Sequence, residues 1–259
     1  MSGESAGNAS TTTTTALVTG ASRGIGEGLL RALRDRGYEV HALALDDDDL
    51  RRVAAETGAI AHGVDIRDVV ALESAIGGIP FDIVINNAGV LPELRPFAEN
   101  ARDAIDLLVD VNLRSALHVT RVVLPGMLTR DRGHLFYLGS IAGKHPTPNT
   151  AVYGATKAAL HAFAEGLRND LLGTSIRVTV LMPGRVQTRL YDGAFGTNDA
   201  ARAALYDDFE AVQPADIAAV VGAAIDLHPH VDLTAIEILP TRQVFGGSRI
   251  ARKEPTTPG

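Results

Sequence analysis

The stretch ALVTGASRGIG, residues 16–26, decides the fold. Residues 16–19 are a short apolar run typical of a buried strand, and the glycines of GASRGIG follow it. After them, residues 28–36 have the apolar period of an amphipathic helix. A glycine turn between a strand and a helix lets backbone N–H groups approach a pyrophosphate. Its spacing, G-x-x-x-G-x-G, differs from the commonest dinucleotide motif, so an ordinary helix N-terminus is an open alternative.

The rest of the chain repeats this alternation of strand and helix. Strand patterns lie at 40–45, 60–64, 81–85, 134–138, 176–181 and 235–239, and helical patterns at 50–57, 69–76, 100–130, 151–172 and 214–227. Such alternation predicts a parallel sheet with helices on both faces. We expect one α/β domain over residues 16–251, a single-domain Rossmann-like doubly wound sheet of about seven strands. The polar stretch 1–15 is predicted to be a disordered tail, and residues 252–259 a polar, proline-containing C-terminal tail.

The composition limits the partners. With 259 residues, 46% hydrophobic, the chain can fill one large core, and its net charge of −7 argues against binding nucleic acid or an anionic membrane. The absence of cysteine excludes disulfides and thiolate chemistry, and the scattered histidines predict no metal site. Without a signal peptide or a membrane-length apolar run, we expect a cytoplasmic protein whose partner is a small molecule.

The end of the second strand bears on cofactor choice. An acid there binds the adenosine ribose hydroxyls and repels a 2′-phosphate. Four aspartates follow this strand, of which we assign Asp46 to the ribose, whereas the other three suit a helix N-terminus. Arg23, in the glycine turn, instead favours a phosphate. We weigh these as favouring NAD over NADP.

A tyrosine and a lysine share one face of a predicted helix. Tyr153 and Lys157 are four residues apart, one turn along the helix over 151–172. A fixed positive charge beside a phenol favours the phenolate and lowers its pKa. Chance alone supplies such a pair rarely, but the motif needs support from its surroundings. Ser140 provides some, because it stands at the end of a strand, where ligands bind in open α/β folds.

Five signals in this order resemble the short-chain dehydrogenase/reductase family over about residues 15–245. They are TG-x-x-x-GIG at 19–26, NNAG at 86–89, Asn112, Ser140, and Y-x-x-x-K at 153–157 followed by PG at 183–184. Residues 227–243, LHPHVDLTAIEILPTRQ, are similar to the branch of serine 3-dehydrogenases, related 3-hydroxy acid dehydrogenases and clavulanic acid dehydrogenases.

The resemblance implies a role for each matching residue. Tyr153 would be the general base or acid, and Lys157 would bind the nicotinamide ribose and lower the Tyr153 pKa. Ser140 would stabilise charge on the substrate oxygen, and Asn112 would hold a water in a proton relay. The implied NAD(P) ligands are Gly20, Ser22, Arg23, Gly24, Ile25, Gly26, Asp46, Asp65, Ile66, Asn87, Ala88, Gly89, Tyr153, Lys157, Pro183, Gly184, Val186 and Thr188.

Basic residues fall in the two loops expected to flank the tyrosine. Lys144, His145, Arg185 and Arg189 lie there in a chain with a net negative charge. They predict an anionic substrate held by one of the arginines, beside Ser140 and Tyr153. Solvated loop charges are the alternative.

Three functions therefore stay open: an NAD(P)-dependent oxidoreductase of a small polar alcohol, an NADPH-dependent ketone or aldehyde reductase of secondary metabolism, and a non-catalytic dinucleotide sensor. The resemblance also suggests a homotetramer, or a homodimer.

Overall fold

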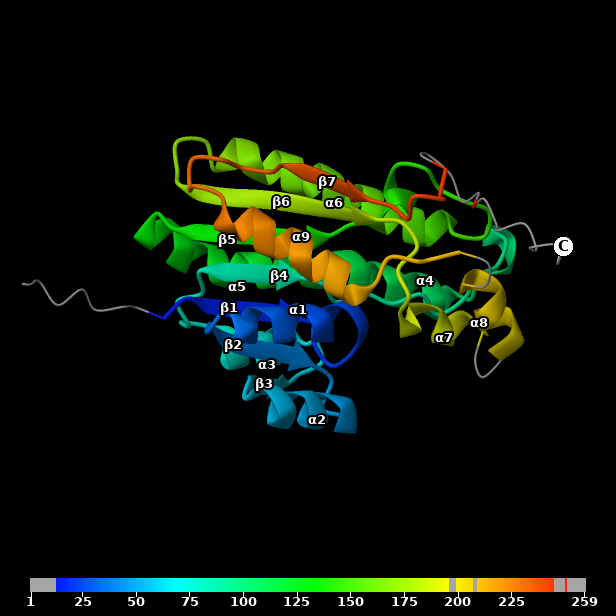
Figure 1. Ribbon diagram of the computed structural model, residues 1–259, viewed down its shortest axis with the longest axis horizontal. Helices are drawn as coiled ribbons and strands as arrows, with labels where there is room; N and C mark the ends of the chain where they lie inside the picture. Colours follow the sequence, from blue (N-terminus) through cyan, green and yellow to red (C-terminus); the bar gives the residue numbers. More distant parts are fainter. Residues whose placement is uncertain (1–12, 196–198, 207–208, 245–249, 251–259) are drawn as a thin grey trace, which may run out of the picture.

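The computed structural model describes residues 13–195, 199–206, 209–244 and 250. In this part of the chain seven parallel strands form one sheet in the order β3-β2-β1-β4-β5-β6-β7 (Figure 1). The strands are β1 (Thr15–Thr19), β2 (Glu39–Ala44), β3 (Ile60–Gly63), β4 (Ile83–Asn86), β5 (Gly133–Leu138), β6 (Ile176–Pro183) and β7 (Ala235–Ile238). The predicted Rossmann-like doubly wound sheet is confirmed.

Helices cover both faces of the sheet. One face packs against α1 (Gly24–Asp35), α2 (Asp48–Thr57) and α9 (Pro214–Asp226), and the other against α3 (Val69–Ile76), α5 (Ser115–Arg130) and α6 (Ala151–Asp170). The strands divide their side chains between the two cores: Ala16 and Val18 of β1 join the first, and Leu17 joins the second. Because both faces are buried, the strands read as continuous apolar runs in the sequence.

The order of the strands places a crevice above β1 and β4. The chain winds outward from β1 through β2 to β3, and then from β4 through β5 and β6 to β7 on the other side. The loops after β1 and β4 therefore separate at the carboxyl edge of the sheet. In open α/β sheets this switch point is where ligands bind.

The predicted helical stretch 100–130 is one continuous helical segment of three parts. It comprises α4 (Arg102–Val109), a π-helix (Asp110–Arg114) and α5, which follow one another without a loop. The loop predicted after β6 carries a 3₁₀ turn (Arg189–Tyr191) and α7 (Asp192–Phe195), and α8 (Asp199–Tyr206) comes next. Two further 3₁₀ turns lie at Phe97–Glu99 and Ile141–Gly143.

Most of the two predicted tails lies outside the described residues, namely residues 1–12 and all of 252–259. Thr15, which we expected in the N-terminal tail, is instead the first residue of β1 and is paired in register with Glu39. None of the described helices is both long enough and apolar enough to span a bilayer.

Candidate active site

A cavity of about 690 Å³ opens at the carboxyl edge of the sheet. Its lining comes mainly from the loops after β1 to β6 and from one face of α6, with Leu107 of α4 and Gln243 after β7. It brings together most of the predicted site, which includes Gly20, Ser22, Arg23, Gly24, Ile25, Asp65, Ile66, Asn87, Ala88, Gly89, Ser140, His145, Tyr153, Lys157, Pro183, Gly184, Arg185, Val186, Thr188 and Arg189. Asn112, Gly26, Asp46 and Lys144 are not among the lining residues.

The glycine turn is packed too tightly for side chains. A Cβ on Gly20 would lie 2.9 Å from the Cα of Ala88, and Gly20 also has a positive φ of 62°. A Cβ on Gly26 would lie 2.1 Å from the Gly20 carbonyl oxygen, which explains a glycine behind the cavity wall. Asn87 fastens the turn, because its Nδ2 donates to the carbonyls of Thr19 (2.8 Å) and Gly20 (3.1 Å).

The N-terminus of α1 is available to an anion. Arg23 is the N-cap residue of α1, and its side chain makes no capping hydrogen bond. The first backbone N–H groups of this helix therefore lack a side-chain acceptor, and they begin at the cavity wall formed by Gly24 and Ile25. A helix N-terminus behind a bare glycine turn suits the pyrophosphate of a dinucleotide. The residues present fit the group that the sequence predicts.

The aspartates after β2 divide their roles differently from our prediction. Asp46 lies outside the cavity, because its carboxylate pairs with Arg51 and packs over Gly63 of β3. Asp47 lines the cavity together with Leu45, which is 59% exposed. Asp47 also caps α2, because one oxygen accepts from Leu50 N at 2.9 Å.

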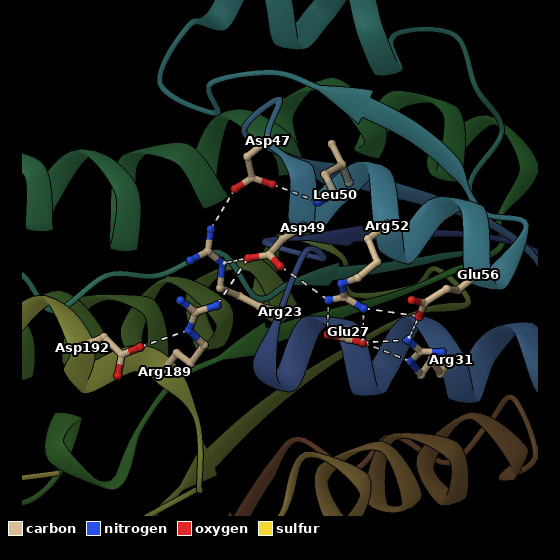
Figure 2. A network of polar contacts seen from close by, with 10 residues as sticks. All are labelled: Arg23, Glu27, Arg31, Asp47, Asp49, Leu50, Arg52, Glu56, Arg189 and Asp192. Carbon is tan, nitrogen blue, oxygen red and sulfur yellow. Dashed lines mark hydrogen bonds and ion pairs between the residues drawn. The ribbon is translucent and has the colours of Figure 1, made fainter. Parts of the chain in front are cut away.

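An ion-pair network joins several of the cavity's lining residues, among them Arg23, Asp47 and Arg189 (Figure 2). Arg23 lies between two acids, with Nη2 2.8 Å from Asp47 Oδ2 and Nε 3.5 Å from Asp49 Oδ2. The same Asp49 oxygen lies 3.4 Å from Nη1 of Arg189, which belongs to the loop after β6. Arg189 also contacts Asp192, with 3.1 Å between its Nε and Oδ2. The positive charges of Arg23 and Arg189 are therefore already paired with carboxylates of the protein.

Tyr153 and Lys157 lie on the cavity face of α6. Lys157 is 4% exposed, its Nζ donates to the Leu138 carbonyl at 2.7 Å, and it lies 5.8 Å from the centroid of the Tyr153 ring. Burial lowers the pKa of Lys157 to about 8. Burial also raises the pKa of Tyr153, and the nearby Tyr191 adds to this, whereas a hydrogen bond with Ser140 lowers it. In the protein alone, the pKa of Tyr153 is therefore raised, whereas we expected Lys157 to lower it.

Asn112 lies behind the cavity, in the π-helix, and fixes the segment after β4. Its Oδ1 accepts from Val90 N at 2.7 Å, and its Nδ2 donates to Val90 O at 3.0 Å. Gly89 lies between it and the lysine: a Cβ there would be 3.4 Å from Asn112 Oδ1 and 3.5 Å from Lys157 Nζ. The two side chains therefore flank the same short stretch of backbone.

The four predicted substrate cations are not equivalent. Lys144 turns away and pairs with Glu237 of β7, while Arg189 is held at the rim by the network above. Arg185 is half-buried in the lining, and its Nη1 donates to the Leu205 carbonyl of α8 at 2.9 Å. His145 also lines the cavity.

Several lining residues were not predicted. They include Leu91, Pro92, Leu107, Thr147, Thr150 and Gln243. Leu91 and Pro92 follow the NNAG motif at a strand end, so their position in the sequence offered a signal. Gln243 offered none, because it reaches the site only through the fold, where its Oε1 accepts from Arg185 N at 2.9 Å.

Comparisons with known proteins agree with this geometry. The family model described as short chain dehydrogenase matches residues 14–198. An uncharacterized short-chain type dehydrogenase/reductase, y4eK, of Sinorhizobium fredii is 43% identical over 92% of this chain and 95% of its own. The NADP-dependent 3-hydroxy acid dehydrogenase YdfG of Salmonella typhi is 34% identical over 91% of this chain and 98% of its own.

A solved structure is similar over the whole fold. The closed form of a serine dehydrogenase complexed with NADP⁺ superposes with a TM-score of 0.87 and 32% identity, covering 92% of this chain and 100% of that one. The chain therefore belongs to the short-chain dehydrogenase family and is an oxidoreductase that uses a nicotinamide cofactor.

Proposed function

We propose that the chain interconverts the alcohol and carbonyl of a small hydroxy acid, with Tyr153 as the general base and acid. The observation that carries this is the shared cavity wall, where Ser140, Tyr153 and Lys157 face the glycine turn and the NNAG loop. A nicotinamide held by these residues would supply the hydride chemistry in either direction. The residues of the chain then only have to position the substrate and move one proton.

The proton passes through Tyr153. In oxidation its phenolate takes the hydroxyl proton as the C–H bond breaks, and in reduction its phenol returns that proton to the carbonyl oxygen. Because burial raises the Tyr153 pKa in the protein alone, the phenolate needs positive charge nearby. Lys157, with a pKa of about 8, is still mostly charged at pH 7. Ser140 donates to the substrate oxygen, and Asn112 with a bound water would connect Lys157 to solvent.

We further propose that NAD is preferred over NADP. The support is the neutralised Arg23: with Asp47 at 2.8 Å and Asp49 at 3.5 Å, a 2′-phosphate would gain no free cation and would face two carboxylates. The names of the relatives favour a second candidate, an NADPH-dependent reductase of ketones or aldehydes, because one is called NADP-dependent and the similar structure contains NADP⁺.

The substrate is proposed to carry an anionic group bound by Arg185. Among the described residues, the guanidinium of Arg185 has one hydrogen-bond partner, the Leu205 carbonyl, and Arg185 lines the cavity, whereas Lys144 does not. The names of the 3-hydroxy acid and serine dehydrogenases are consistent with such a substrate.

The protein is proposed to act in the cytoplasm as a homotetramer. Support for assembly comes from β7, which stands at one edge of the sheet, and from exposed apolar side chains of the helical segment that precedes α6, namely Val109 and Leu128.

The test is turnover of a panel read at the NADH absorbance. Each compound is tested with NAD(H) and with NADP(H). The panel contains L-serine, 3-hydroxypropionate, 2-hydroxyethanesulfonate, a sugar, and the aldehyde formed when the 3-hydroxyl of 3-hydroxypropionate is oxidised. We expect turnover of at least one acid or its carbonyl form, with higher kcat/KM for NAD(H). Tyr153→Phe should lose at least about 1,000-fold in kcat while binding NADH within about threefold of the unmodified protein. A Tyr153→Phe variant that keeps a tenth of the activity would overturn the role, and higher kcat/KM for NADP(H) would favour the second candidate.

A further inference from the structure

A histidine lies on the same face of α6 as the tyrosine and the lysine, one turn further along. Residues 153, 157 and 161 are successive turns of one helix, and His161 is half-buried. It is not part of the cavity lining. Its ring instead lies behind the wall that carries Ser140.

The chain leaves room for this ring on both sides of Ser140. A Cβ on Gly139 would lie 2.3 Å from His161 Nε2, and a Cβ on Gly143 would lie 2.6 Å from its Cε1. Neither glycine has a positive φ, so the backbone conformation does not require glycine at either place. At Gly139 the imidazole is the closest obstacle to a side chain. At Gly143 the backbone of α6 excludes a Cβ as well, with Ala158 N at 2.8 Å and Lys157 C at 2.9 Å.

The contact with Ser140 specifies the protonation of the ring. Ser140 N donates to His161 Nε2 at 3.4 Å, so Nε2 must carry a lone pair and the proton of the neutral ring belongs on Nδ1. Ser140 also begins the 3₁₀ turn over Ile141–Gly143, because its Oγ accepts from Ala142 N at 3.1 Å. His161 thus fixes the backbone N–H of Ser140, and the 3₁₀ turn fixes its hydroxyl.

Burial, with the charges around the imidazole, favours its neutral form by lowering the His161 pKa. Lys157 on α6 and Lys144 after the 3₁₀ turn disfavour a positive ring, and Glu237 on β7 favours it but is paired with Lys144. Burial is the largest influence, and together these lower the pKa of His161 below its usual 6.5. Protonation would place an N–H against the Ser140 N–H and break the contact.

We propose that His161 is a positioning residue whose neutral imidazole holds the Ser140 segment in its productive geometry and whose protonation releases it. The enzyme would then lose activity as the pH falls through the His161 pKa, while cofactor binding is retained. This inference rests on the proposed function, because Ser140 matters only if it contacts the reacting oxygen.

The experiment compares His161→Gln with His161→Leu and the unmodified protein. A glutamine amide oxygen accepts from Ser140 N without titrating, whereas leucine fills the space but cannot accept. With the carbonyl form of 3-hydroxypropionate, or of another panel compound that is turned over, kcat for reduction is measured from pH 5 to 8. Reduction uses Tyr153 as the phenol, so the tyrosine itself gives no acid limb. We expect an acid limb below pH 6.5 in the unmodified protein and a limb reduced at least threefold in His161→Gln. His161→Leu should lose about tenfold in kcat at every pH, with NADH binding unchanged within about threefold.

A second readout needs no turnover. Imidazole NMR of the full-length protein, assigned by the signals lost in His161→Gln, should show a ring protonated on Nδ1 with a pKa below 6.5. The inference is overturned if His161→Gln keeps the full acid limb, or if the ring is protonated on Nε2 at pH 7. Tyr153→Phe separates the two failures: if it stays active the proposed function fails, and if it is inactive while the acid limb persists in His161→Gln, only the role of His161 fails.

Discussion

Arg23 and Asp47 form the ion pair that bears most directly on cofactor choice, with 2.8 Å between Nη2 of the arginine and Oδ2 of the aspartate. They come from the turns after β1 and β2, which lie side by side in the sheet, and both residues line the cavity. The Asp47 carboxylate thus pairs with the Arg23 guanidinium, the cation that could otherwise bind a 2′-phosphate.

We expect Asp47→Asn to shift the preference toward NADP. Asparagine is an equally good N-cap, so α2 keeps its cap on Leu50 while Arg23 loses its nearest counter-charge. The ratio of kcat/KM for NADP to that for NAD should rise about 3- to 10-fold, as expected from one exposed ion pair of about 1 kcal/mol. Asp48→Asn is the matched control, because Asp48 begins the same helix and pairs with Arg51 instead. Equal ratios in the two variants would contradict the role of Asp47.

The two arginines after β6 should differ as substrate ligands. Arg185→Met is expected to raise KM for an anionic substrate at least about tenfold, the loss of one charge-assisted hydrogen bond, and to leave KM for a neutral alcohol within about twofold. Arg189→Met should change neither by more than about twofold, because Asp49 and Asp192 already engage that side chain. Steady-state kinetics with both substrates in both variants decides the matter. A similar rise for the neutral alcohol in Arg185→Met would show loss of packing rather than loss of an anion site.

A buried histidine far from the cavity should make stability depend on pH. His134 of β5 is 2% exposed, its Nε2 lies 2.8 Å from Thr179 Oγ1, and burial lowers its pKa to about 3. Between that value and about 6.5 the unfolded chain binds the proton and the folded chain does not, so this residue removes stability as the pH falls.

The expected loss from His134 approaches about 1.4 kcal/mol per pH unit below pH 6.5. Urea unfolding at pH 7, 6 and 5 should show a steeper loss of stability in the unmodified protein than in His134→Gln, whose side chain does not titrate. The variant will be less stable at pH 7, so the slopes and not the absolute values carry the comparison. Parallel slopes would mean that His134 is protonated in the fold.

The architecture followed from local patterns, and the orientation of side chains did not. Apolar runs and glycine turns mark each strand, which is why the sheet and the helix bearing Tyr153 could be predicted. Lys144 was predicted to bind substrate because its actual partner, Glu237, lies 93 residues later in the chain and the sequence does not reveal their ion pair. The four aspartates after β2 look alike in sequence, and the bend of the chain there turns Asp46 outward and Asp47 inward. Gln243 reaches the cavity through the tertiary fold alone.

The π-helix over Asp110–Arg114 puts the helical segment out of phase with itself. One extra residue in a turn rotates everything that follows by about 100° relative to an uninterrupted α-helix. Within the π-helix the amide of Asn112 contacts Val90, and after it the side chains of Ala116, Val119, Val123 and Met127 pack in the core against the sheet. A regular α-helix through the same residues could keep either the contact of Asn112 with Val90 or the packing of α5 on the sheet, but not both. Removing a single residue from this turn should therefore disturb both the wall behind Lys157 and the core, although it deletes at most one of the residues that form them.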